Sequence, residues 1–308
     1  MNRILDSNGI NEVSARSPLF GLFVGKESPL ELSQCLIPIT TYFSREGQHS
    51  NNANIDNLTT AASVAGDMAA QLKSKTKLKV CQELDRSSLE KLSREEIAAI
   101  CLYTFESGPY QILNDVLRNN DRNSVKPFVD YLWLLMHALS KCPRPLESVV
   151  YRGIRGHVSD VEYIPGNLVV WPAFSSCTTL CSVLTKNETF LGVEGMRTQF
   201  HITLTTNRAR SIVHVSSFSN ESEVLLPPNT RLRVIDVSDH GNGLVIILLK
   251  EEPCFDPILP FRDDLSTPPS RAAAHSGKYL PLTLPTLERN RVGYFVALIW
   301  SNYFRTIF

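Results

Sequence analysis

Two glutamates stand one residue apart in the segment FSNESEVLLPP, residues 218–228, where a short apolar run begins and then ends in two prolines. If the chain is extended here, Glu221 and Glu223 point to the same side of it, because side chains alternate along a strand. Like charges placed in this way repel each other unless a cation or a hydroxyl-rich ligand lies between them. One carboxylate at a strand end is usually just solvated, but this pair predicts a ligand-binding site.

Other reactive side chains match known kinds of site poorly. Cys177 and Cys181 are four residues apart without a nearby histidine or second cysteine pair, which does not indicate a zinc site. The segment FSSCTTLCS, residues 174–182, is rich in hydroxyls and thiols, and His201 and His214 follow it. Since no GxSxG motif or family-specific cysteine signature surrounds them, a hydrolase stays possible but without direct support. The chain also lacks a Walker loop and a GxGxxG motif.

Charge and composition narrow the classes of partner. The 308 residues include 31 Lys and Arg and 31 Asp and Glu, so no net field favours nucleic acid or an anionic membrane. The seven cysteines are not spaced in a way that indicates disulfide pairs, so we expect mostly reduced, buried side chains. MNRILDSNGINEV lacks the apolar region of a signal peptide, and the apolar segment 292–300 is short and followed by polar residues. We expect a cytoplasmic or unconventionally exported protein without membrane insertion or a lipid anchor.

Helical patterns dominate the first half of the chain. Residues 59–145 are predicted to form a helical lobe, beginning with an alanine-rich stretch. Ser93 and Glu96 have the spacing of a capping box ahead of an apolar run. Apolar residues at intervals of three and four predict further helices over 110–118 and 128–140.

Short β-rich runs follow, separated by Gly, Pro or Asn. These runs are SVVYRGI, NLVVWPAF, QFHITLTT, SIVHVSSF, SEVLLPP, TRLRVIDV and GLVIILLK. Residues 146–250 are therefore predicted to form a β-rich core, with a turn at DHGNG before the last run. Helices followed by strands, without βαβ alternation, predict an α+β fold with an antiparallel or mixed sheet.

The sequence on either side of residues 59–250 differs in composition from the predicted helices and strands. Residues 1–58 are predicted to be an N-terminal appendage that ends in a polar surface linker over 44–58. Residues 251–308 are predicted to be a Pro-rich and then apolar tail. A single domain over 59–250 would then carry the function.

Three separated motifs resemble the arginine-specific mono-ADP-ribosyltransferases. They are VVYRGI at 149–154, FSSCT at 174–178 and ESEVLLPP at 221–228, and that family is recognised by an Arg, a Ser-x-Ser/Thr and a Glu-x-Glu in this order. The helical segment from Tyr103 to Arg118 is also similar to the family's N-terminal helices. The resemblance covers about residues 90–250. It implies a helical lobe packed on a split, mostly antiparallel β-core, with an NAD cleft in that core.

The resemblance implies a reaction and roles for both glutamates. The enzyme would break the nicotinamide–ribose bond of NAD, with NADP possible, and transfer ADP-ribose to an arginine of an acceptor protein. Glu223 matches the catalytic glutamate, which stabilises positive charge on the ribose. Glu221 matches the glutamate that binds the acceptor guanidinium and assists its deprotonation. The acceptor and the NAD hydroxyls would then account for the paired charges.

The same resemblance implies roles for the other motif residues. Arg152 would hold phosphate or ribose oxygens of NAD, and Gly153 would let the backbone approach the nicotinamide amide. Ser176 would position the catalytic glutamate, with Thr178 in the third place of a variant motif. Phe218 could stack on the acceptor guanidinium, although a packed loop anchor explains it nearly as well.

Two alternatives remain open at this stage. An NAD glycohydrolase would use water in place of arginine, and a catalytically weak relative would only bind NAD or other proteins. The complete set of Arg152, Ser176 and Glu223 speaks against the second. No metal is implied, and the expected partner is a protein with an exposed arginine.

Overall fold

The structure is a computed structural model, and it describes most of the chain up to residue 254. The described residues are 22–23, 31–45, 51–77, 89–105, 108–119, 121–186, 191–216 and 222–254. The predicted C-terminal tail lies outside these residues from position 255 onward.

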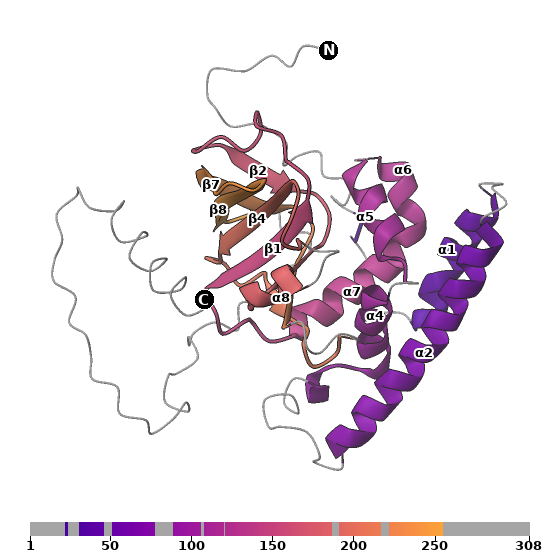
Figure 1. Ribbon diagram of the computed structural model, residues 1–308. Helices are drawn as coiled ribbons and strands as arrows, with labels where there is room; N and C mark the ends of the chain where they lie inside the picture. The colour runs from indigo at the N-terminus through magenta and orange to yellow at the C-terminus, as the bar shows by residue number, and fades with distance from the viewer. Residues whose placement is uncertain are drawn as a thin grey trace, which may run out of the picture. The chain divides into compact units, whose positions relative to one another are not determined.

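The described elements begin with helices and continue with strands (Figure 1). The helices are α1 (Leu32–Arg45), α2 (Asn51–Lys77), α4 (Arg94–Thr104), α5 (Tyr110–Arg118), α6 (Arg122–Val125), the 3-10 turn η2 (Lys126–Phe128), α7 (Val129–Lys141) and α8 (Cys181–Lys186). The strands are β1 (Val149–Arg155), β2 (Leu168–Trp171), β3 (Ser175–Thr178), β4 (Arg197–Thr203), β5 (Arg210–Ser211), β6 (Glu223–Leu226), β7 (Thr230–Asp239) and β8 (Leu244–Glu252). In Figure 1 the helices α1 to α7 gather beside the sheet, and α8 lies next to β1.

The predicted helices of the lobe are confirmed, including the start of α4. The Ser93 hydroxyl accepts a hydrogen bond from the Glu96 amide at 3.1 Å, and the Glu96 carboxylate accepts one from the Ser93 amide at 2.7 Å. Glu96 is fully buried, and its other oxygen accepts from Lys141 Nζ at 2.6 Å. This ion pair ties the beginning of α4 to the end of α7.

The predicted linker over 44–58 is wrong in its second half, because α2 begins at Asn51. Its Asn-rich first turns have low helix propensity, but Leu58, Ala61 and Ala65 are buried in the core of the helical lobe, where α2 packs against other helices. Packing of one helical face outweighs local propensity here. Helix α1, from the predicted appendage, also contributes buried residues to this core. The domain boundaries at 59 and 250 stay a prediction.

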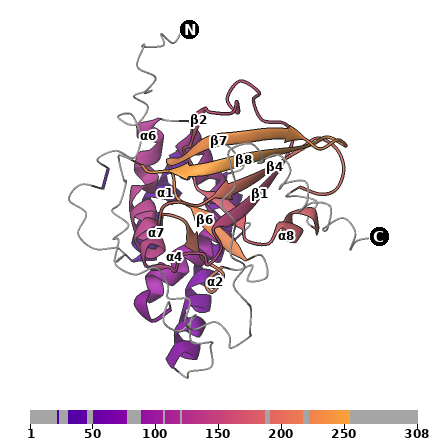
Figure 2. The ribbon, with the colours of Figure 1, turned by 90° about the vertical axis from the view of Figure 1, so that its left-hand side faces the viewer.

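The eight strands form one mixed sheet, in the order β2-β7-β8-β4-β1-β3-β6-β5 (Figure 2). Only β4 and β8 run parallel, and every other neighbouring pair is antiparallel. Strands β1 and β3 meet at a single residue pair, Tyr151 with Thr178, whereas β1 pairs with β4 over its whole length. The predicted α+β class with a mostly antiparallel core is confirmed, and this narrow junction divides the core into two parts.

The run SIVHVSSF, predicted as a strand, forms only the end of β5. After Ser211 the chain turns, and the Ser216 amide donates to the Ile212 carbonyl at 2.7 Å. Ile212 and Val215 are buried in the core of the helical lobe. An apolar side chain can thus be buried by a turn as well as by a strand, and the alternating pattern does not distinguish the two.

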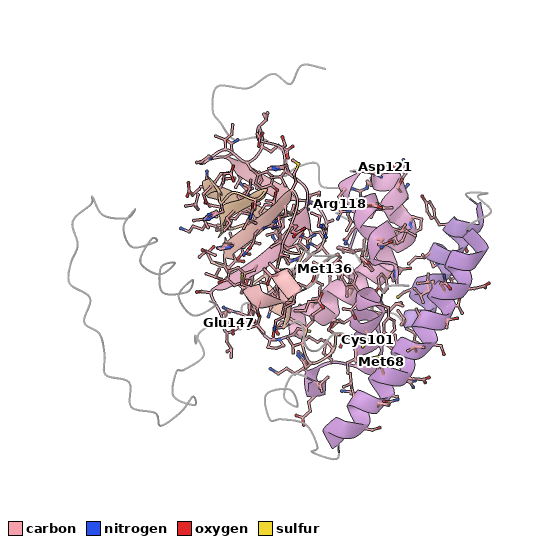
Figure 3. The ribbon with its side chains drawn as sticks, viewed as in Figure 1. Met68, Cys101, Arg118, Asp121, Met136 and Glu147 are labelled. Carbon is pink, nitrogen blue, oxygen red and sulfur yellow. The ribbon has the colours of Figure 1, made fainter. Side chains whose placement is uncertain are left out.

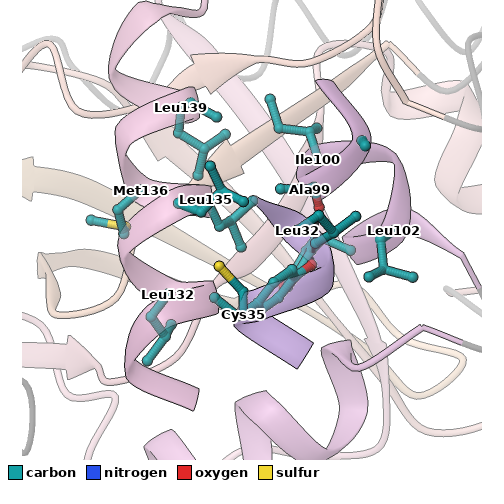
Figure 4. Packing of buried hydrophobic residues seen from close by; sticks show 14 of the residues in the cluster. Leu32, Cys35, Ala99, Ile100, Leu102, Leu132, Leu135, Met136 and Leu139 are labelled. Carbon is teal, nitrogen blue, oxygen red and sulfur yellow. Dashed lines mark hydrogen bonds between the residues drawn. The ribbon is translucent and has the colours of Figure 1, made fainter. Parts of the chain in front are cut away.

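Two hydrophobic cores lie on the two faces of strand β6. The first fills the helical lobe, where α1, α4 and α7 interlock through residues such as Cys35, Ile100 and Leu135 (Figure 4). It also includes Leu225 of β6. The second core contains Val224 of the same strand, since neighbouring side chains of a strand point to opposite faces. Strand β6 is therefore buried on both faces, which fixes its register.

A membrane-spanning helix is not found in the part of the chain that the structure describes: none there is both long and apolar enough.

Candidate active site

A cleft of about 1090 Å³ lies between the helical lobe and the sheet. One wall is formed by α4 and α5, and the other by β1, β3, the start of β6 and α8. Five residues of the three sequence motifs line it, namely Arg152, Gly153, Ser176, Thr178 and Glu223. The structure thus brings together residues that are up to 71 positions apart in the chain.

Glu223 is the first residue of β6, and its side chain is almost completely buried in this cleft, with 7% of the residue exposed. Its Oε1 accepts a hydrogen bond from the Ser176 hydroxyl at 2.6 Å, and its Oε2 accepts one from the Ser216 hydroxyl at 2.8 Å. Burial raises the pKa of Glu223 above its ordinary value, while both serine hydroxyls lower it. Burial outweighs the hydroxyls, so the carboxylate is a strong and poorly solvated acceptor.

Arg152 connects the two parts of the sheet beside this carboxylate. Its Nη1 donates to the Ser176 carbonyl at 2.7 Å, and its guanidinium carbon lies 5.9 Å from the centre of the Trp171 ring. One bond leaves most of the five donors of the guanidinium available to a ligand in the cleft. Gly153 follows Arg152 on the cleft wall, where it adds no side chain that would restrict access.

Thr178 and Cys177 occupy less reactive positions. The Thr178 hydroxyl accepts a hydrogen bond from the Leu180 amide at 3.0 Å, so it stabilises the turn after β3. Cys177 belongs to the second hydrophobic core, and burial raises its pKa to about 12. Burial likewise lowers the pKa of His201 to about 4, and its Nε2 lies 2.9 Å from Gln199 Nε2. Cys177 therefore does not form the thiolate that the hydrolase alternative would need.

Glu221 and Phe218 lie outside the described residues. Ser222, between the two glutamates, has a φ of 47°. This is the left-handed region, which a non-glycine residue enters only at a cost. The assumption that ESEV is extended, on which the same-side geometry of Glu221 and Glu223 was based, is therefore wrong at Ser222.

Sequence reasoning missed the helical wall of the cleft. Asn114 on α5 is buried, and its Nδ2 donates to the Tyr103 hydroxyl at 3.1 Å. Its Oδ1 has no hydrogen-bond partner, although it is buried at the cleft. Arg118 lies one turn further along on the side of α5 toward the sheet, and pairs with Asp115 at 2.7 Å (Figure 3). The spacing of four between Tyr110, Asn114 and Arg118 was a readable signal of one polar helix face.

Ser216 was also missed, because its segment was predicted as a strand. Its only sequence signal is a hydroxyl seven residues before Glu223.

Metal-ligand clusters and disulfides were both absent from the described residues. In the ranges that the structure covers, no group of three His, Cys, Asp or Glu side chains could hold a metal ion. None of the six cysteines described there forms a disulfide, and four of them are buried. Their burial agrees with the prediction of mostly buried cysteines.

Comparisons with known proteins agree with this geometry. Residues 43–253 match the family described as NAD:arginine ADP-ribosyltransferase. No curated protein matches. Among solved structures, the type III effector XopAI of Xanthomonas axonopodis pv. citri, lacking 70 N-terminal residues, has a TM-score of 0.51 at 16% identity over 79% of this chain and 96% of that one. This likeness supports the fold.

Two further similar structures are named as ADP-ribosyltransferases. HopU1 of Pseudomonas syringae pv. tomato DC3000 has a TM-score of 0.45 at 18% identity over 63% of this chain and 97% of that one. The Vis toxin of Vibrio splendidus has a TM-score of 0.44 at 21% identity over 63% and 86%. Since the family match spans more than half of the chain, the protein belongs to the NAD:arginine ADP-ribosyltransferase family, a family of transferases that use NAD.

Proposed function

We propose that the protein cleaves the nicotinamide–ribose bond of NAD and transfers ADP-ribose to arginine side chains of an acceptor protein. The proposal rests above all on Glu223, a buried carboxylate held by two hydroxyls in a cleft that also contains Arg152. An anion of this kind is worth most to a reaction in which positive charge develops next to it.

Glu223 would act in the first half of the reaction. The bond between the ribose C1′ and the nicotinamide nitrogen breaks, and the leaving nicotinamide takes both electrons and becomes neutral. The ribose is left with oxocarbenium character, as in glycoside hydrolysis. Because Glu223 is poorly solvated, its charge is little screened and stabilises this cation more than a surface carboxylate would. It would also accept a hydrogen bond from a ribose hydroxyl.

Arg152 and the α5 wall would bind the dinucleotide. The guanidinium of Arg152 offers paired N–H donors to phosphate oxygens, an arrangement that lysine cannot reproduce. Arg118 faces it across the cleft and offers a second cation to the pyrophosphate. The unpaired Oδ1 of Asn114 would accept from a ligand hydroxyl or amide, which would remove the cost of leaving it unsatisfied. The cleft volume of about 1090 Å³ is large enough for a ligand of this size.

Glu221 would act in the second half of the reaction. An arginine guanidinium is protonated at neutral pH and is not a nucleophile in that state. Glu221 would bind it and accept one proton as a guanidinium nitrogen attacks C1′, so the product is an N-glycosidic bond and the charge is conserved. Phe218 would stack on the incoming guanidinium. These two roles rest on the family resemblance.

The test uses NAD labelled in its adenine part and a small guanidine acceptor, with NADP in a parallel series. We expect transfer by the wild type, no turnover by Glu223→Ala, and continued NAD hydrolysis with little transfer by Glu221→Gln. Hydrolysis without any transfer by the wild type would favour the NAD glycohydrolase instead. Transfer that survives Glu223→Ala would show that the proposed catalytic residue is wrong.

A further inference from the structure

We propose that Ser216 is a positioning residue for Glu223. The Ser216 hydroxyl fixes the carboxylate oxygen of Glu223 that Ser176 does not reach. The inference rests on the proposed catalytic role of Glu223. It extends that role to a residue outside the three sequence motifs, in a segment where the structure replaces a predicted strand with a turn.

Each oxygen of the Glu223 carboxylate has its own hydroxyl donor. Ser176 donates to Oε1 at 2.6 Å, and Ser216 donates to Oε2 at 2.8 Å. The last side-chain torsion of a glutamate, χ3, has a broad range of allowed angles. A carboxylate that is held at one oxygen only can therefore still rotate about χ3. A second donor on the other oxygen fixes the plane of the group. Developing charge on the ribose then meets a carboxylate that does not have to reorient.

The Ser216 hydroxyl is itself held in place. The backbone amides of Val215 and Ser216 both donate to the Ile212 carbonyl, at 2.9 and 2.7 Å. Ile212 and Val215 are buried in the lobe core, and the Cys101 thiol of α4 donates to the Val215 carbonyl at 3.0 Å (Figure 3 labels Cys101). Ser176 stands on β3. Glu223 is thus held between the sheet on one side and the helical lobe on the other.

The effect of Ser216 on the Glu223 pKa can be measured, because the neighbouring groups do not titrate in the same pH range. Burial raises the pKa of Tyr103 on α4 and of Cys177 on β3, so both are neutral at neutral pH. Arg152 on β1 supplies a guanidinium to the same cleft. Among these described neighbours, Glu223 alone changes its charge in the acidic range. Without the Ser216 hydroxyl, the charged form of Glu223 loses one of its two hydroxyl donors, and the Glu223 pKa rises further.

The experiment compares the full-length wild type with Ser216→Ala, Ser216→Thr and Ser124→Ala. Ser124 is a matched control, because its hydroxyl donates to the Asp121 carboxylate at 2.6 Å outside the cleft. NAD turnover is measured against pH, and the Glu223 carboxyl is titrated by carbon NMR with its signal assigned through its loss in Glu223→Gln.

For Ser216→Ala we expect kcat to fall about tenfold, as for one hydrogen bond to a charged group, with KM for NAD nearly unchanged. The acid limb of the rate profile and the Glu223 titration should both move to higher pH. Ser216→Thr, which keeps a hydroxyl, should restore most of the rate, and Ser124→Ala should resemble the wild type.

An unchanged Glu223 titration in Ser216→Ala would overturn the inference, and so would failure of Ser216→Thr to restore the rate. If Ser216→Ala does not fold, Ser216→Cys fills nearly the same space with a much weaker donor, and the same shifts are expected in it. A wild type that does not turn over NAD would refute the proposed function. The NMR titration would still decide whether Ser216 controls Glu223.

Discussion

Replacing Ser176 by alanine should slow NAD cleavage without disturbing the architecture around it. The substitution removes the hydroxyl that donates to Glu223 Oε1 at 2.6 Å. It leaves the backbone carbonyl of Ser176, which accepts from Arg152 at 2.7 Å, so the link between β1 and β3 is retained. The Ser216 hydroxyl continues to hold the other carboxylate oxygen. The loss is therefore limited to one charge-assisted hydrogen bond.

A hydrogen bond to a charged group contributes about 1.5–3 kcal/mol, which corresponds to roughly a 10- to 100-fold change in rate. This loss should fall mainly on kcat, because the carboxylate matters most when the ribose becomes cationic. The Glu223 pKa should rise as well, so the defect should be larger on the acidic side of the rate profile.

Steady-state kinetics of NAD cleavage between about pH 5 and 8, with Ser175→Ala as the control, measure this effect. Ser175 precedes Ser176 on β3, and its side chain points to the opposite face of the strand. A Ser176→Ala enzyme with wild-type kcat and a raised KM would refute the reasoning, since the hydroxyl would then bind NAD and not position Glu223.

Two further effects are expected. Arg118→Ala should raise KM for NAD by up to about tenfold with little change in kcat, measured in the same assay. The reason is that an exposed cation that already pairs with Asp115 contributes to binding and not to chemistry. An unchanged KM would exclude α5 from the NAD site. His201→Gln should reduce the stability lost in acid. The pKa of His201 is lowered to about 4 in the folded protein from its ordinary 6.5, so the unfolded chain binds the proton first, and up to ~3 kcal/mol is lost as pH falls from 6.5 to 4. Urea unfolding of wild type and variant at both pH values measures this, and equal acid losses would contradict it.

Local sequence patterns were sufficient for much of the helical lobe. The capping box at Ser93 and the helices over 110–118 and 128–140 were all predicted, since capping and helical periodicity depend on residues within a few positions of each other. The linker over 44–58 was predicted wrongly in part. The burial of Leu58 and Ala61 in a core built from helices far apart in the chain is not visible in local composition.

The three motifs named the chemistry of the site in a similar way. Arg152, Ser176 and Glu223 were chosen by residue type and order alone, and all three line one cleft. Their order could not show that Ser176 and Glu223 share a hydrogen bond, because this depends on the pairing of β3 with β6 across 47 residues of chain. The resemblance supplied the expectation, and the strand register supplies the contact.

Residue types in this chain were therefore enough to suggest the proposed reaction, in which a carboxylate and an arginine act on a dinucleotide, because such chemistry depends on functional groups. The three-dimensional packing alone decided which further groups contact that carboxylate or line its cleft. Ser216 arrives through a turn where alternation predicted a strand, and Asn114 arrives on the facing helix. At Ser222, a φ of 47° breaks the extended geometry that the paired glutamates had suggested. Long-range packing, which no local pattern records, is the physical reason for each difference.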